Sequence, residues 1–158
     1  MLQFRDVMTA KDPEIIRNIA GSTGFFDKKD TEINFVIAKN ALQGYNKEKY
    51  RYIFAEYNGK TVAYACFGKI LDADFAYELY WLSTLNEYRG LGIGKKIMNE
   101  LLLHIKKLGG RKLFVKTEGT TKYLPTRQFY EKCGFRNEAI LKEYYQTYDD
   151  CHIYSYHL

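Results

Sequence analysis

The sequence predicts an α/β (α+β) fold, with a mixed central sheet of about seven strands, about four flanking helices and a single domain over residues 1–158. Apolar stretches rich in aromatic and β-branched residues alternate with stretches of helical periodicity. Near the middle, a glycine-rich turn joins a strand to a helix that another strand follows, which implies a parallel strand pair. A chain of 158 residues, 46% hydrophobic and 27% charged, suits one globular domain.

The N-terminal part predicts one strand and two helices. Residues 2–7 can start a strand, and Asp12 before Pro13 is typical of a helix N-terminus with Asp12 as the cap. A second helix is predicted to begin near Asp30 or Thr31 and to run to residue 42, because apolar residues recur there at helical spacing.

Three strands follow. The stretches 50–57 and 61–70 flank Asn58-Gly59, which is typical of a tight hairpin turn because both turn positions adopt positive φ. After a turn at residues 72–74, the stretch "FAYELYWLSTL" at residues 75–85 predicts a third strand.

The remaining elements complete the order β-α-α-β-β-β-α-β-α-β-β. Their patterns are an amphipathic helix, a short apolar strand, a short helix and two closing strands joined by a turn at Asp149-Asp150. The corresponding ranges are 94–108, 111–117, 126–133, 138–148 and 151–158.

Composition argues against several classes of protein. No apolar run approaches the roughly 18 residues that span a membrane, and charges interrupt the N-terminus where a signal peptide would be apolar. Cys66, Cys133 and Cys151 are far apart, so neither a metal site nor a disulfide framework is expected. The net charge of +5 is modest and spread along the chain. We therefore expect a cytoplasmic protein with no metal and no nucleic-acid or membrane partner.

The stretch "NEYRGLGIGKK" at residues 86–96 predicts an anion site, because a glycine turn at a helix start exposes unpaired N–H groups to a ligand. It is not a P-loop, since Lys96 stands where Ser or Thr would follow Gly94-Lys95. It is not a GxGxxG dinucleotide motif either, because Gly90 and Gly92 would require a third glycine at Lys95.

The sequence pattern of this stretch, R-G-x-G-x-G, resembles the acetyl-CoA signature of the GNAT superfamily of N-acetyltransferases. Arg89, Gly92 and Gly94 match that signature, and "FYEKCGF" at residues 129–135 resembles a second family motif. Both motifs stand in the family's order, and the resemblance covers nearly the whole chain. It implies the GNAT fold and acetyl-CoA as the acyl donor.

The resemblance also implies where the donor lies. The glycine turn would hold the pyrophosphate of coenzyme A, and the preceding strand would bond the pantetheine arm through Leu82 and Thr84. The residues expected to bind the donor are Leu82, Ser83, Thr84, Arg89, Gly90, Leu91, Gly92, Ile93, Gly94 and Lys95.

The implied reaction is attack of an amine on the thioester. An alkylamine has a pKa near 10 and is mostly protonated at neutral pH, so a base is expected. Glu78 is the first candidate, because some family members carry a glutamate at this offset from the motif, and Glu118 is the second. Tyr130 occupies the position of the family's general acid to the thiolate. Tyr123 replaces an asparagine that many members use to bond the cofactor arm, so this loop is expected to differ.

Three functions stay open at this point. The first is an N-acetyltransferase acting on a primary amine of a small molecule or peptide. The second is a non-catalytic acyl-CoA sensor or regulatory module, and the third is a basic RNA-binding α/β domain, which no RNP-like stretch supports. The acceptor is not readable from the sequence. A homodimer is a further alternative, since GNAT-like domains often dimerise.

Overall fold

A seven-stranded sheet runs through the molecule in the computed structural model, which describes residues 1–158. Its order is β1-β2-β3-β4-β5-β7-β6. The strands are β1 (Leu2–Arg5), β2 (Arg51–Tyr57), β3 (Lys60–Lys69), β4 (Ala76–Thr84), β5 (Lys112–Glu118), β6 (Arg136–Gln146) and β7 (Asp149–His157). The helices are α1 (Asp12–Ser22), α2 (Lys28–Leu42), α3 (Ile93–Lys107) and α4 (Leu124–Lys132), with short 3-10 helices at Asn86–Tyr88 and Thr121–Tyr123. The predicted single-domain α/β fold and its element order are confirmed.

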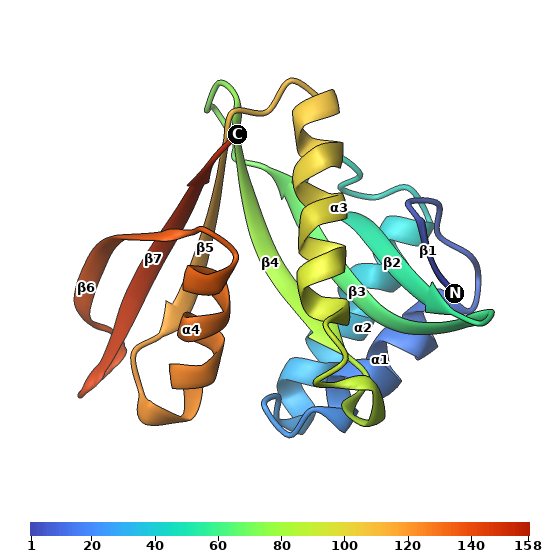
Figure 1. Cartoon of the computed structure of the whole chain (residues 1–158), viewed down its shortest axis with the longest axis horizontal. Coiled ribbons are helices and arrows are strands. Elements are labelled where there is room, and N and C mark those ends of the chain that lie inside the picture. Colours follow the sequence, from blue (N-terminus) through green and yellow to red (C-terminus); the bar gives the residue numbers. More distant parts are fainter.

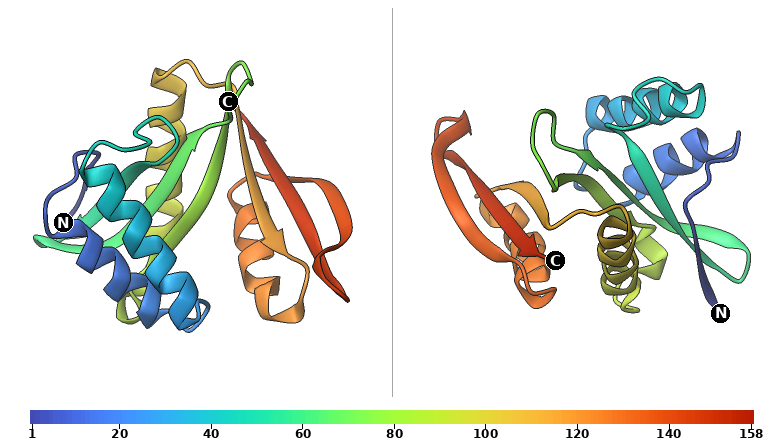
Figure 2. Two further views of the ribbon diagram at one scale, coloured as in Figure 1. Left: turned by 180° about the vertical axis from the view of Figure 1, so that it is seen from behind. Right: turned by 90° about the horizontal axis from the view of Figure 1, so that it is seen from above.

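Helices cover both faces of the sheet. Figure 1 shows α3 and α4 in front of it, and Figure 2 shows α1 and α2 on the opposite face. The apolar stripe of α3, with Ile97, Leu101 and Ile105 at its centre, packs into the larger core cluster. Ile16 and Ile19 of α1 belong to a second cluster on the other face. No helix is both long enough and apolar enough to cross a membrane.

Strands β4 and β5 form the parallel pair of the sheet, and this pairing is short. Residues Ala76–Leu79 of β4 pair with Lys112–Val115 of β5, and no pairing continues beyond them. A register shift on the β3 side leaves Tyr80 unpaired as a β-bulge, which bends a strand and increases its twist. The two strands then diverge, and Figures 1 and 2 show the sheet opening into two halves at this point.

Local turn chemistry confirms some of the predicted boundaries. Asn58 and Gly59 form the β2–β3 turn with φ of 49° and 82°. The second helix begins earlier than predicted, at Lys28, because the Asp27 carboxylate caps it by accepting the Asp30 N–H at 2.7 Å.

Asp12 is not the cap of α1, contrary to the prediction. Lys11 holds the N-cap position, and Asp12 is buried inside the first turn. Its carboxylate binds the Arg5 guanidinium at 2.6 Å and accepts the Thr9 N–H at 2.6 Å. The carboxylate therefore ties the helix start to β1.

The turn between the closing strands also differs from the prediction. It lies at residues 147 and 148, and Tyr148 adopts a positive φ of 63°. Asp149 and Asp150 belong instead to β7, where Asp149 is only 2% exposed. A residue that was expected in the turn is thus a buried carboxylate of β7.

Candidate active site

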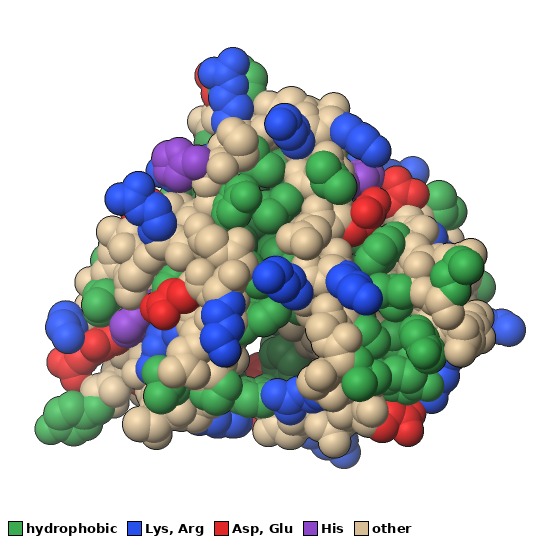
Figure 3. Space-filling model, in the orientation of Figure 1, with side chains coloured by type: hydrophobic (Ala, Val, Ile, Leu, Met, Phe, Trp, Pro, Cys, Tyr) green, Lys and Arg blue, Asp and Glu red, His purple; other side chains and the backbone are tan.

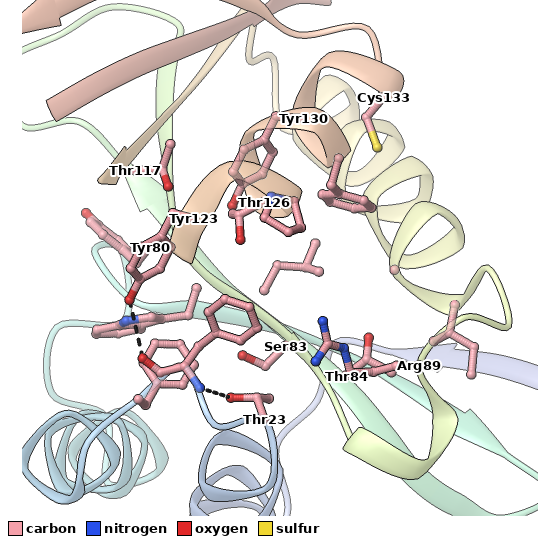
Figure 4. A pocket seen from close by; sticks show the side chains of 18 of the residues that line it. Thr23, Tyr80, Ser83, Thr84, Arg89, Thr117, Tyr123, Thr126, Tyr130 and Cys133 are labelled. Carbon is pink, nitrogen blue, oxygen red and sulfur yellow. Dashed lines mark hydrogen bonds between the residues drawn. The ribbon is translucent and has the colours of Figure 1, made fainter. Parts of the chain in front are cut away.

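A cavity of about 910 Å³ lies where β4 and β5 diverge. Its walls come from the α1–α2 loop, α2, β4, the glycine turn and start of α3, β5, α4 and β6. The space-filling view shows a hollow between the two halves with Lys and Arg side chains around it (Figure 3). Figure 4 shows side chains from several of these elements directed into the same space.

The glycines of the turn are required for two different structural reasons. Gly90 and Gly92 adopt φ of 80° and 77°, a left-handed backbone that side chains disfavour, and the space beside them is open. Gly94 has ordinary backbone, but a Cβ there would stand 3.3 Å from the Phe129 ring. The first two glycines shape the turn, and the third lets α4 approach α3.

The turn presents a row of free donors. The N–H groups of residues 90–95 donate to no other group of the protein, since the first bond of α3 runs from Lys96 N–H to Gly92 C=O. Arg89 and Lys95 border the same space, and Lys132 adds a third cation from α4. Free N–H groups at a helix start, with cations beside them, form an anion site. Leu91 contributes only backbone here, because its side chain is exposed and outside the cavity.

The edge of β4 offers a second set of free backbone groups. Leu85 N–H donates to Val62 C=O at 2.7 Å, so antiparallel alternation turns the backbone of Ser83 toward β3. The same alternation turns the N–H and C=O of Leu82 and Thr84 toward β5, which no longer pairs there. An extended ligand arm can therefore bond this edge as a strand would. Ser83 and Ile93 also line the cavity.

Tyr130 presents an unengaged hydroxyl to the cavity. The residue is 7% exposed, and aromatic rings of Phe129, Phe135 and Tyr154 surround it at centroid distances of 5.6, 5.6 and 6.0 Å. Its hydroxyl makes no hydrogen bond within the protein and points into the cavity (Figure 4). Burial raises the pKa of the phenol, so Tyr130 remains a neutral O–H donor at neutral pH.

Of the two predicted bases, the structure brings Glu118 into the cavity but not Glu78. Glu78 lies on the paired part of β4, opposite Phe114, before the strands separate. Its carboxylate is 3.6 Å from the ammonium of Lys116, and it does not line the cavity. Glu118 ends β5 and is part of the cavity wall. The geometry therefore favours Glu118 over the Glu78 of the sequence prediction.

The surroundings of Glu118 make it a stronger base than an ordinary glutamate. Partial burial raises the pKa of its carboxyl first, and the carboxyl of Asp149 within hydrogen-bonding reach raises it further. The Tyr123 hydroxyl and the charge of Lys122 act in the opposite direction. Asp149 has no salt bridge, and its Oδ1 is buried without a hydrogen-bond partner. The proximity of Asp149 to Glu118 was not predicted from the sequence, because Asp149 was expected to lie in a turn.

Two further residues fix the loop that follows Glu118. Arg127 of α4 donates from Nη1 to the carbonyl oxygens of Glu118 and Thr120 at 2.7 and 2.9 Å. The Tyr123 hydroxyl donates to Phe25 C=O at 3.3 Å, and the two rings lie 5.7 Å apart. Tyr123, which replaces the family's usual asparagine, therefore joins this loop to the α1–α2 loop across the cavity.

The end of the cavity nearest α1 and α2 is aromatic. No group of three or more His, Cys, Asp or Glu side chains is arranged to hold a metal ion anywhere in the chain. The aromatic residues at this end are Phe25, Phe26, Tyr80, Trp81 and Tyr123.

Known proteins share this architecture. A protein of the GNAT family from Desulfovibrio desulfuricans is 32% identical, with a TM-score of 0.96 and 99% of each chain covered. A streptothricin acetyltransferase structure from Bacillus anthracis, in complex with acetyl coenzyme A, has 18% identity and a TM-score of 0.64 over 72% of this chain and 65% of that one. The second likeness concerns the fold alone.

The sequence itself matches one curated enzyme and one family. The [ribosomal protein bS18]-alanine N-acetyltransferase of Haemophilus influenzae is 27% identical over 104 residues, which are 66% of this chain and 67% of the enzyme. The Acetyltransferase (GNAT) family matches residues 16–135, which confirms the resemblance of the two motifs. The chain therefore belongs to the GNAT family of acetyltransferases and is an acyltransferase.

Proposed function

We propose that the protein transfers the acetyl group of acetyl-CoA directly to a primary amine, with Glu118 as general base and Tyr130 as general acid. The observation that carries this proposal is that groups suited to donor binding and to proton transfer lie around the same cavity. The free N–H groups of residues 90–95, the unpaired edge of β4 and two proton-transfer groups border one cavity.

The donor end supports acetyl-CoA as the acyl donor. The free N–H groups, Arg89 and Lys95 would take the pyrophosphate, and Leu82 and Thr84 would bond the pantetheine amides. A free N–H of the β4 edge would also polarise the thioester carbonyl. Each of these groups lacks another hydrogen-bond partner, which is what a preorganised site requires.

The reaction then follows from the two proton-transfer groups. Glu118 takes a proton from the acceptor ammonium, and the neutral nitrogen attacks the thioester carbon. When the C–S bond breaks, Tyr130 donates its proton to the leaving thiolate. The nitrogen's second proton restores the phenol, and Glu118 releases its own proton to solvent. The products are an N-acetylated amine, coenzyme A and one proton.

The curated relative from Haemophilus influenzae is a ribosomal-protein alanine N-acetyltransferase by name. A peptide amine is therefore one acceptor to test for this chain, together with small amines. The alternative, a non-catalytic acyl-CoA sensor, would not need the unengaged hydroxyl that Tyr130 presents to the cavity.

A matched pair of substitutions tests the assignment of the base. We expect Glu118→Gln to lower kcat/KM at neutral pH by about 100-fold and to remove the acidic limb of its pH profile. Glu78→Gln should leave both close to those of the unaltered protein, since Glu78 does not line the cavity and its carboxylate pairs with Lys116. Thiol release from acetyl-CoA measures the rates. Loss of the acidic limb in Glu78→Gln but not in Glu118→Gln would identify Glu78 as the general base.

Calorimetric titration with acetyl-CoA tests the donor separately. Absence of binding at millimolar concentration would overturn the donor assignment. Binding without thiol release over a broad panel of amines and peptides would favour the sensor.

A further inference from the structure

The charges that line the cavity are segregated between its two ends. The cations Arg89, Lys95 and Lys132 stand at the end formed by the glycine turn and α4. The lining carboxylates, Asp30 and Glu118, come from α2 and the end of β5. The cations suit the phosphates of the donor, so the carboxylates surround the remaining part of the cavity, where the acceptor would enter.

Each cation near the acceptor end already contacts another group of the protein. Lys116 lines this end, but its ammonium is 3.6 Å from the Glu78 carboxylate. Lys122 lies outside the lining and donates to Phe25 C=O at 3.3 Å. Arg89 is at the border between the two ends, with its guanidinium 5.4 Å from the Phe25 ring centroid.

The carboxylates, in contrast, are unpaired. Asp30 and Glu118 form no salt bridge, and the buried carboxyl of Asp149 beside Glu118 affects its pKa more strongly than the nearby charge of Lys122 does. Asp149 is 2% exposed, with one carboxylate oxygen lacking any partner. A buried, unpartnered acid behind the cavity wall makes this end favour positive charge and disfavour any added negative charge.

The walls of this end are aromatic, and the β-bulge contributes to this. Because Tyr80 is the extra residue, Leu79 packs into the cluster beneath α3, whereas Tyr80 and Trp81 pack on the side of α1 and α2. There they join Phe25 and Phe26. Aromatic faces attract ammonium groups and also accommodate an apolar substituent.

We propose that the acceptor is a primary ammonium that carries an apolar substituent and no carboxylate on the adjacent carbon, so that free α-amino acids are poor substrates. This inference rests on the proposed function and specifies its substrate class. The α-carboxylate of a free amino acid would face Asp30 and Glu118. The nearby cations Lys116, Lys122 and Arg89 already contact Glu78, Phe25 C=O and the Phe25 ring, respectively. A peptide amino terminus and an alkyl- or arylamine both satisfy the stated chemistry, because in each the carboxylate is absent or replaced by an amide.

Matched pairs of acceptors that differ by one carboxylate test the inference. The pairs are tyramine with tyrosine, and an alanine-initiated peptide amide with alanine. We expect kcat/KM, followed by thiol release, to be at least about tenfold higher for the carboxylate-free member of each pair, because like charges repel in a desolvated site. The pair that reacts fastest distinguishes a peptide from a small amine as the source.

Asp30 should be a specificity-determining residue in this experiment. Asp30→Asn should reduce the ratio of the tyramine rate to the tyrosine rate. Glu32→Gln is the matched control, because Glu32 lies on the same helix, pairs with Arg17 at 3.0 Å and does not line the cavity.

The outcomes separate this inference from its premise. Equal or faster acetylation of the free amino acids would overturn the inference and leave the proposed function standing. An unchanged tyramine-to-tyrosine ratio in Asp30→Asn would show that Asp30 does not determine specificity. No thiol release with any amine or peptide would overturn the proposed function, and the inference with it.

Discussion

Tyr130 is a buried tyrosine that lines the cavity and whose hydroxyl has no partner in the protein, whereas the unpartnered hydroxyl of Tyr52 is buried in the core. Tyr64 is fully buried and donates to Asn34 Oδ1 at 2.7 Å, as a buried hydroxyl normally does. The Tyr130 hydroxyl has no such partner although its ring is packed on several sides. A hydroxyl that faces the cavity without a protein partner is free to bond a ligand, which agrees with a role in catalysis.

Tyr130→Phe tests this role. The substitution removes only the unengaged hydroxyl, so thermal stability and acetyl-CoA affinity should stay close to those of the unaltered protein. Turnover should fall by about 100-fold, the usual contribution of a general acid. Steady-state kinetics and calorimetry measure the two quantities. Loss of affinity equal to the loss of turnover would show that Tyr130 acts through packing.

Asp149→Asn tests the tuning of Glu118. Burial and Asp149 both raise the pKa of the Glu118 carboxyl, so the unaltered enzyme needs a higher pH to free its base. Removing the charge of Asp149 lowers that pKa, and the acidic limb of the kcat/KM profile should move to lower pH. The adjacent Asp150→Asn is the control, since Asp150 pairs with Lys142 at 3.2 Å. A limb that does not move in Asp149→Asn, in a protein that melts normally, would contradict the role of Asp149.

At the scale of elements, the glycine turn and α3 form one unit. The turn needs left-handed backbone at Gly90 and Gly92, and this geometry leaves the first N–H groups of α3 uncovered. Residue 94 then has a different constraint, the approach of Phe129 from α4. The "FYEKCGF" motif thus packs against the glycine turn, and residues of both motifs line the same cavity.

Gly92→Ala tests the two consequences of this turn. We expect a loss of about 1 kcal/mol in unfolding free energy from strained backbone, measured by denaturant titration. Acetyl-CoA affinity should fall as well, because the new methyl group enters the open space beside the free N–H groups. Gly59→Ala is the matched control, since Gly59 has φ of 82° and open surroundings in the distant β2–β3 turn. Similar affinity losses in both variants would contradict a donor site at the turn.

At the scale of the whole molecule, the gap between β4 and β5 divides the sheet but leaves the halves connected. The strands pair at one end, and at the other the Tyr123 and Lys122 contacts with Phe25 cross the opening. A ligand in this gap would replace the missing β5 partner along the edge of β4. Binding should therefore protect backbone that the protein alone leaves unpaired.

Amide hydrogen exchange, resolved by residue, tests this prediction. On addition of acetyl-CoA, exchange should slow at Leu82, at Thr84 and at residues 90–95, whose N–H groups have no partner in the protein. The amide of Lys47, in the exposed loop between α2 and β2, should be unaffected. Protection that spared the β4 edge would place the pantetheine arm elsewhere.

The sequence by itself determined the order of the elements and located the glycine turn before α3. Helical periodicity, the Asn58-Gly59 turn and the glycines before α3 act over a few residues, so their backbone geometry can be read locally. The choice between Glu78 and Glu118 needed the structure, because it depends on where β4 stops pairing with β5. The position of Asp149 likewise depends on a turn placed two residues earlier than the pattern predicted. Strand register and bulges arise from contacts between distant parts of the chain, so only the tertiary structure decides which side chains share a cavity.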